Sequence, residues 1–193
     1  MKKIFLAWLP FAVTITLLCG LVYAAVQQDY RQSANDPQVQ VAEDSAQALA
    51  RGATPQDIMP PYQTDIATSL SAYIALFNSD GQTIISSALL NNKPPTLPGG
   101  IFDYVRKYGE TRVTWQPQKG IRSAIVVDSV KNASGTVMGF VMVGRSLREV
   151  EIREDNLMKM VGLGWLATLV AAFAALWLVA WRRKDKSEQS ETD

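Results

Sequence analysis

The chain has 193 residues, a formal net charge of +1 and a hydrophobic fraction of 48%. This near-neutral balance excludes the basic surface that is typical of nucleic-acid-binding proteins. Histidine is absent, which excludes a His-ligated metal, a Ser-His-Asp triad, a Cys-His pair and a phospho-accepting histidine. The single cysteine, Cys19, lies in an apolar run, so any folded domain in this chain must be stable without disulfides.

Two uncharged runs, one near each end, are long enough to cross a bilayer. Lysines precede the first run and a basic cluster follows the second, and positive charge tends to stay on the cytoplasmic side. We therefore expect a multi-pass protein of the bacterial cytoplasmic (inner) membrane, with both termini in the cytoplasm. The predicted parts are a cytoplasmic N-terminus (1–3), a first span (4–26), an extracytoplasmic domain (27–159), a second span (160–181) and a short cytoplasmic tail (182–193).

The first apolar run has an alternative interpretation as a cleaved signal peptide. Val22 and Ala24 would then be the small residues before the cut. The apolar core of this run exceeds the usual length of about 7–15 residues, which favours a retained anchor. Both interpretations place the middle domain on the same side of the membrane.

Helical patterns follow the first span. Residues 27–35 are polar and are expected to continue the helix for a turn or two. Asp36 and Pro37 fit the N-cap and the first position of a new helix, in which apolar residues recur at helical spacing up to Gly52. A further N-cap signal predicts a short additional helix over residues 54–59.

Strand patterns begin at Ser71. Two β-rich runs on either side of Asp80 and Gly81 predict a hairpin over residues 71–88. A loop and a short helix over residues 97–108 come next. Three further strands are predicted, at residues 111–115, 121–130 and 136–146. Adjacent strands with a helix against one face are typical of an antiparallel α+β sheet.

These elements resemble a known family. The stretches IALFNSDGQTIISSA, TLPGG, RVTWQPQKGIRSAIVV and GFVMVGRSLREVE are similar to the extracytoplasmic single-Cache (PAS-like) sensor domain of bacterial sensor histidine kinases. The resemblance covers about residues 30–157. It implies an α+β fold with a PAS-like antiparallel five-stranded sheet and N-terminal helices, flanked by two transmembrane helices. Such kinases continue into HAMP, dimerisation and ATP-binding modules, whereas this sequence ends at Asp193.

The resemblance also implies a small-molecule site between the sheet and the helix and loop that cover it. An arginine beside an aromatic wall would suit a carboxylate, because a guanidinium binds it bidentately. The alternative is that the aromatic residues are ordinary core and that the arginine is a surface residue of a strand. The candidate ligand-binding residues are Tyr73, Phe102, Tyr104, Arg112, Trp115 and Arg122.

The stretch from Gly139 to Val170 joins the last predicted strand to the second span without a proline. One hypothesis is a rigid signal-transmitting helix that acts on a second copy or another membrane protein. The alternative is a solvated helix that merely ends the domain. The candidate transmitting residues occupy a and d heptad positions, which Glu154 interrupts: Leu147, Val150, Leu157, Val161 and Gly164.

Two classes of function are compatible with these features. The first is a ligand-sensing module that signals through a separate membrane partner, such as a histidine kinase, or as a homodimer. The second is a structural or assembly factor of the cell envelope that binds a protein and no small ligand. We expect no catalytic residues, no metal and no cofactor, because the acidic residues at Glu43 and Asp128 have no recognisable catalytic partner in the sequence.

Overall fold

The computed structural model describes residues 2–33 and 36–189. The chain divides into two compact units. One unit combines the two ends of the chain, up to Asp29 and from Arg153, and the other is formed by Tyr30–Ile152. The break predicted around Asn35 lies outside the described residues, as does the last part of the tail, residues 190–193.

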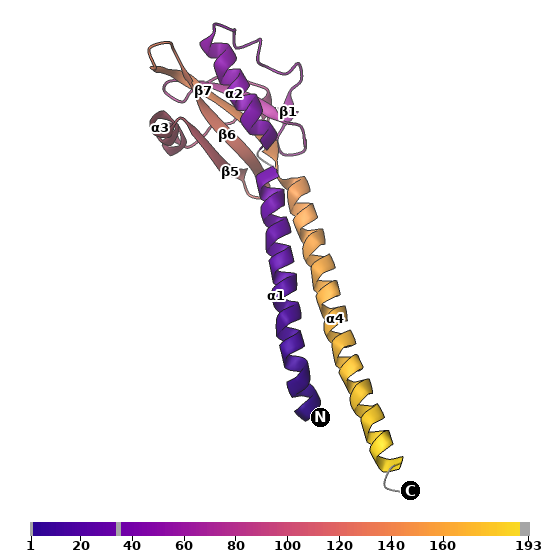
Figure 1. Cartoon of the computed structure of the whole chain (residues 1–193). Helices are drawn as coiled ribbons and strands as arrows, with labels where there is room; N and C mark the ends of the chain where they lie inside the picture. Colours follow the sequence, from indigo (N-terminus) through magenta and orange to yellow (C-terminus); the bar gives the residue numbers. More distant parts are fainter. Residues whose placement is uncertain (1, 34–35, 190–193) are drawn as a thin grey trace. The chain divides into compact units, whose positions relative to one another are not determined.

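The unit formed by the two ends contains the antiparallel helices α1 (Lys2–Ser33) and α4 (Arg148–Gln189), both of which extend beyond its limits (Figure 1). Each is long and apolar enough to cross a membrane, by length and composition. A tryptophan on each helix donates a hydrogen bond to the other helix. The Trp8 indole donates to the Leu169 carbonyl at 3.1 Å, and the Trp165 indole donates to Thr16 Oγ1 at 2.9 Å. The predicted spans 4–26 and 160–181 fall within these two helices.

The helix α4 is continuous and extends beyond the predicted end of the span, through the described part of the tail. Within the unit formed by the ends, its least exposed stripe contains the predicted positions Leu157 and Val161. Gly164 is exposed, and Trp165 and Leu169 continue the stripe in its place. The stripe faces α1 at Trp165, whose indole donates to Thr16.

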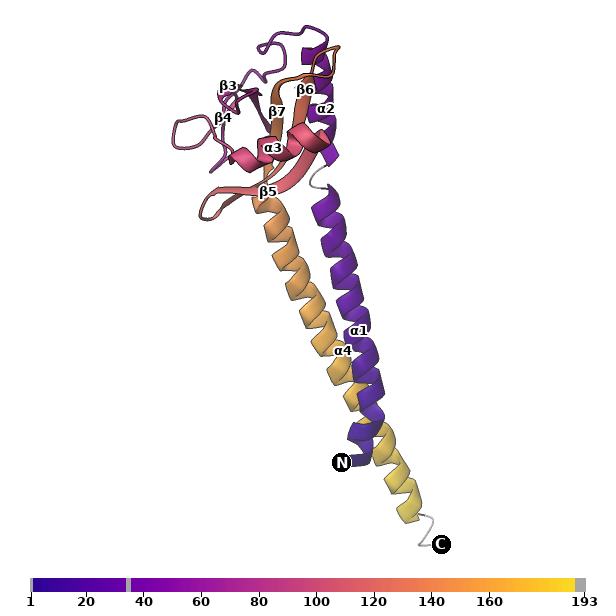
Figure 2. The same cartoon turned by 90° about the vertical axis from the view of Figure 1, so that its left-hand side faces the viewer.

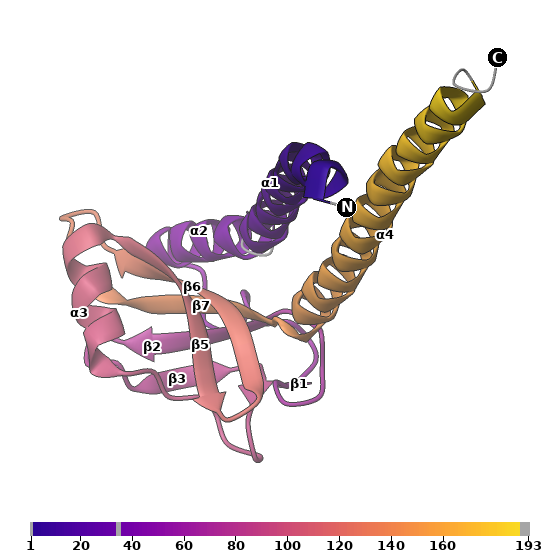
Figure 3. The same ribbon diagram turned by 90° about the horizontal axis from the view of Figure 1, so that it is seen from below.

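The unit Tyr30–Ile152 contains a five-stranded antiparallel sheet of order β3-β2-β7-β6-β5 (Figures 2 and 3). Numbered along the chain, this order is 2-1-5-4-3, which is a PAS-like arrangement. The predicted fold class, an antiparallel five-stranded sheet with N-terminal helices, is confirmed. The strands are β2 (Tyr73–Asn78), β3 (Thr83–Ser86), β5 (Glu110–Gln118), β6 (Ile121–Lys131) and β7 (Val137–Ser146).

Helices cover both faces of this sheet (Figure 3). Phe102 and Val105 of α3 (Gly99–Tyr108) belong to the core on one face, and Ala42 and Ala46 of α2 (Asp36–Ala50) belong to the core on the other. Because side chains alternate along a strand, β2 sends Tyr73, Ala75 and Phe77 to the α3 face and Ile74 and Leu76 to the α2 face. Burial on both faces explains why the central strands are almost continuously apolar.

Two local features differ from the sequence-based expectation. Residues 54–59 form turns rather than a helix. The Asp57 carboxylate accepts hydrogen bonds from the backbone N–H and the hydroxyl of Thr54, but Pro60 follows too soon for a helix to continue, because proline disfavours helical geometry in the residue before it. The structure also has a short parallel pair that was not predicted, β1 (Thr64–Asp65) with β4 (Ala88–Leu89).

Candidate functional site

A pocket-forming loop lies between β4 and α3. Asn91 and Asn92 have φ angles of +52° and +64°, the left-handed geometry that the central residues of a tight hairpin turn need. Asparagine adopts it more readily than most residues other than glycine. On either side of the turn, the backbones of Leu90 and Lys93 exchange hydrogen bonds of 2.8 and 3.1 Å. The turn therefore gives the loop a defined shape.

The loop is fastened to both edges of the sheet. The Thr83 hydroxyl on β3 donates to the Pro95 carbonyl at 3.2 Å, and the Asn91 amide donates to Gln118 Oε1 on β5 at 3.3 Å. Because β3 and β5 are the two edge strands, the loop spans the sheet, and its residue Leu97 packs against the core on the α3 face. Contacts at both edges hold the loop over this face.

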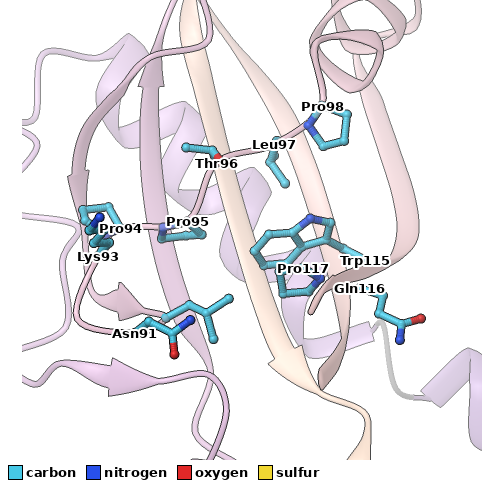
Figure 4. Close-up of a pocket in the computed structure, with 11 residues that line it drawn as sticks. Asn91, Lys93, Pro94, Pro95, Thr96, Leu97, Pro98, Trp115, Gln116 and Pro117 are labelled. Carbon is cyan, nitrogen blue, oxygen red and sulfur yellow. The ribbon is translucent and has the colours of Figure 1, made fainter. Parts of the chain in front are cut away.

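A pocket of about 670 Å³ lies between this loop and β5. Figure 4 shows the Trp115 ring beside Pro117, with Leu97 and Pro95 of the loop facing them. The Trp115 side chain is only 8% exposed and forms an apolar wall. The lining residues are Leu90, Asn91, Lys93, Pro94, Pro95, Thr96, Leu97, Pro98, Trp115, Gln116 and Pro117.

The chemistry of this pocket is suited to holding a small molecule. An apolar wall with a few polar groups at the rim is typical of small-molecule sites. Asn91 and Thr96 supply neutral donors and acceptors, and Lys93 carries the only charge among the lining residues. Such a pocket suits a ligand with an apolar body and an acceptor or anionic group that reaches Lys93.

Three of the predicted site residues share one core. Tyr73, Phe102 and Trp115 belong to the cluster on the α3 face, and of these Trp115 lines the pocket. Tyr104 is half-exposed on α3, where its ring packs against that of Tyr108 at a centroid distance of 4.5 Å. Phe102 therefore supports the pocket from within the core, whereas Tyr104 takes no part in lining it.

The two predicted arginines lie on the opposite face of the sheet. Arg112 is three residues before Trp115 on β5, and side chains an odd number apart on a strand point to opposite faces. Trp115 pairs with Ser123, so the neighbouring Arg122 also points away from the pocket. Arg112 pairs with Glu110, and Arg122 pairs with Glu151 in the first turn of α4. The structure does not bring either guanidinium to the aromatic wall.

Two buried hydroxyl groups lie on the same face of the sheet as Trp115. The Tyr73 ring packs directly over Gly144, where an added Cβ would lie 2.4 Å from the ring. Burial raises the pKa of Tyr73 to about 12, and the nearby Ser123 hydroxyl opposes this shift. Neither hydroxyl has a partner at hydrogen-bonding geometry among the described residues. The mostly apolar core behind the pocket wall thus contains two buried hydroxyl groups.

Three acidic residues that are far apart in the sequence are neighbours on the α2 face of the sheet. Asp128 on β6 pairs in register with Glu110 on β5 and lies within electrostatic reach of Glu43 on α2. Burial raises the pKa of the Asp128 carboxyl, the two neighbouring carboxylates add to this shift, and Lys131 and the Ser129 N–H oppose it. The ionised form of Asp128 therefore destabilises the folded domain.

We predict that Asp128→Asn raises the stability of the domain at pH 7. The folded state binds the Asp128 proton more tightly than the unfolded chain does, so the penalty is present above the folded-state pKa and disappears as the pH falls below the ordinary value of 3.8. Thermal unfolding between about pH 3.5 and 7 should show the gain of the variant shrinking as the pH is lowered. Asp80→Asn, in the exposed β2–β3 turn, is the control and should show no such trend. Equal stability of Asp128→Asn and the parent at pH 7 would contradict the prediction.

Most of the lining residues were predicted from the sequence only as part of a loop. The signals that could have identified them are the consecutive Asn91 and Asn92, which favour a left-handed turn, and the prolines that follow, which stiffen the chain. What the sequence does not show is that Thr83 and Gln118 hold this loop across the sheet.

No protein-family model matches this chain, and no curated protein matches it. Among solved structures, the chain is similar to the ligand-binding domain of the Pseudomonas fluorescens chemoreceptor CtaA in complex with L-isoleucine (16% identity, TM-score 0.45) and in complex with L-serine (17%, 0.42). Each alignment covers 69% of this chain, and 58% and 61% of those chains. The chain thus spans about three-fifths of the length of these domains. Similarity at this level assigns neither a ligand nor a function to the chain.

Proposed function

We propose that this chain is a membrane-anchored ligand-sensing module, with the domain 27–159 outside the cytoplasmic membrane and both termini inside. The observation that carries the proposal is the pocket between Trp115 and the loop that is fastened to both edges of the sheet. A preformed concave site with an apolar wall and a polar rim is suited to binding, and the proposed activity is binding rather than catalysis.

The start of α4 is well placed to report on the state of the sheet. Only Leu147 separates β7 from α4, and its N–H donates to the Arg122 carbonyl on β6 at 2.9 Å. Arg122 also pairs with Glu151 of α4, and the Arg148 guanidinium donates to the Thr68 carbonyl. We propose that a change in the sheet passes through this turn into the second span, and from there to a second copy or a separate membrane partner such as a histidine kinase.

A ligand screen on the full-length chain in detergent micelles tests the sensing function. Thermal unfolding is measured with amino acids, dicarboxylates and nucleosides. A compound that binds the folded state at a concentration 100 times its Kd adds about 2.7 kcal/mol of stability. We expect a selective gain with one of these classes, and we expect Trp115→Ala to abolish it.

Tyr104→Ala is the matched control, because it also removes an aromatic ring but from an exposed position outside the pocket. The control should retain the gain. A screen that is silent for every class, together with stable capture of one envelope protein, would overturn the sensing function in favour of an assembly factor. A gain that survives Trp115→Ala would place the binding site elsewhere.

A further inference from the structure

A second pocket, of about 390 Å³, lies on the opposite face of the sheet from the Trp115 pocket. Its wall is formed by the first turn of α2 and by the end of β7, together with the segment that precedes β2. Val41, Leu70 and Val143 supply apolar surface, and Gln38 and Arg145 supply polar groups. None of these residues lines the Trp115 pocket, so binding here would not require a ligand in that pocket.

Gln38 is the residue that points to a ligand. Its side chain is 1% exposed although it lines a pocket, and its Oε1 has no hydrogen-bond partner among the described residues. A buried acceptor without a partner is unfavourable, and native structures rarely retain one. A ligand with an O–H or N–H group near Gln38 would satisfy it.

Arg145 supplies the complementary charge at the rim of the same pocket. Its Nε donates to the Leu70 carbonyl at 3.2 Å, which holds the guanidinium in place. Its Nη2 is 3.7 Å from Glu149 Oε2, an ion pair too long for a hydrogen bond. A guanidinium has five N–H donors, so capacity remains for a carboxylate. The N-terminal turn of α2 adds a partial positive charge, which favours an anion and disfavours a cation.

We propose that this pocket binds a small 2-hydroxycarboxylate with a short branched apolar tail. The carboxylate pairs with Arg145, the hydroxyl donates to Gln38 Oε1, and the tail packs against Val41, Leu70 and Val143. A neutral hydroxyl suits the position near Gln38, because a buried amide oxygen needs a hydrogen-bond donor and a hydroxyl supplies one without adding a second charge to bury. A carboxylate on Arg145 also competes with Glu149 in the first turn of α4, so occupancy weakens one contact between the sheet and that helix.

Titration calorimetry on the full-length chain in detergent micelles tests this assignment with three probes. The probes are 2-hydroxyisovalerate (each enantiomer), isovalerate, which lacks the hydroxyl, and methyl 2-hydroxyisovalerate, which lacks the charge. We expect one enantiomer of the hydroxy acid to bind, isovalerate to bind about tenfold more weakly because it leaves Gln38 unsatisfied, and the ester to show no binding.

Two substitutions assign the binding to this pocket. Gln38→Leu should make the hydroxy acid and isovalerate bind equally, and Gln38→Met provides a second variant in case the first does not fold. Arg145→Met should lower the affinity for both acids at least about tenfold, because it removes a charge-assisted pair. Arg122→Met is the matched control, since it removes a neighbouring arginine that does not line the pocket. Trp115→Ala should leave the affinity unchanged.

Absence of binding by either enantiomer at millimolar concentration would overturn the proposal. So would an affinity that neither Gln38→Leu nor Arg145→Met changes, or one that Trp115→Ala abolishes, because the acid would then occupy the other pocket. These outcomes are distinguishable from failure of the sensing function, which is decided by compounds whose effect depends on Trp115.

Discussion

Replacing Phe102 by alanine is expected to lower the free energy of unfolding of the domain by about 4 kcal/mol. The Phe102 ring is 4% exposed and lies between the rings of Phe77 and Phe140, at centroid distances of 5.2 and 4.9 Å. It also packs on Gly81 in the β2–β3 turn. Truncation removes apolar burial and leaves a cavity between α3 and the sheet.

Urea unfolding of the full-length chain in micelles, followed by near-ultraviolet circular dichroism, measures this loss. Tyr104→Ala is the control on the same helix, because that ring is half-exposed, and it should cost no more than about 0.5 kcal/mol. Phe102→Leu should fall between the two. The loop over the pocket leads directly into α3. Phe102→Ala should therefore also lower the affinity for any ligand whose binding depends on Trp115. Similar losses for Phe102→Ala and Tyr104→Ala would show that α3 is not held by this aromatic contact.

Gly139→Ala is expected to destabilise the domain by about 3 kcal/mol, although alanine is intrinsically better than glycine inside a strand. A Cβ at position 139 would lie 2.4 Å from the backbone carbonyl oxygen of Phe77 on the neighbouring strand. Both strands are central in the sheet, so neither backbone can move without breaking its pairing on the other side. Steric overlap therefore outweighs the entropic gain of roughly 0.5–1 kcal/mol that alanine would bring.

The matched control is Gly99→Ala at the first position of α3. An added Cβ there has no heavy atom within 4 Å, so the substitution should be neutral or slightly stabilising. The same urea titration compares the two variants. A Gly139→Ala variant as stable as the parent would mean that β2 and β7 do not approach each other as closely as the structure shows.

Several elements could be predicted from the sequence because their signals are local. The long apolar runs predicted two membrane-spanning helices, and α1 and α4 have the required length and composition. Asp80 and Gly81 between two β-rich runs predicted the hairpin of β2 and β3, and the run ending at Tyr108 predicted α3. Runs of adjacent strands beside a helix indicated an antiparallel α+β sheet, and the resemblance to Cache domains added the PAS-like five-stranded arrangement.

The candidate site was predicted less completely, and for two physical reasons. The alternation of side chains along β5 could have separated Arg112 from Trp115, since they are three residues apart. The position of Arg122 could not be deduced in this way, because its face depends on the β5–β6 register. The pocket also depends on hydrogen bonds from Thr83 and Asn91 to partners far along the chain, which no local pattern indicates.

The amino-acid sequence was sufficient to predict which segments are apolar enough to span a membrane, and where the long helices and the five strands of the main sheet form. It did not predict the turns at residues 54–59 or the short β1–β4 pair. The predicted properties depend on residue type and on periods of two or about 3.6 residues within one segment. Only the tertiary structure shows that Trp115 and the loop at residues 90–98 line one pocket, and that Gln38 shares another pocket with Arg145. It also shows that Asp128 lies within electrostatic reach of Glu43. These contacts depend on strand order, register and the packing of helices on each face, which arise only when distant segments bury their apolar sides together.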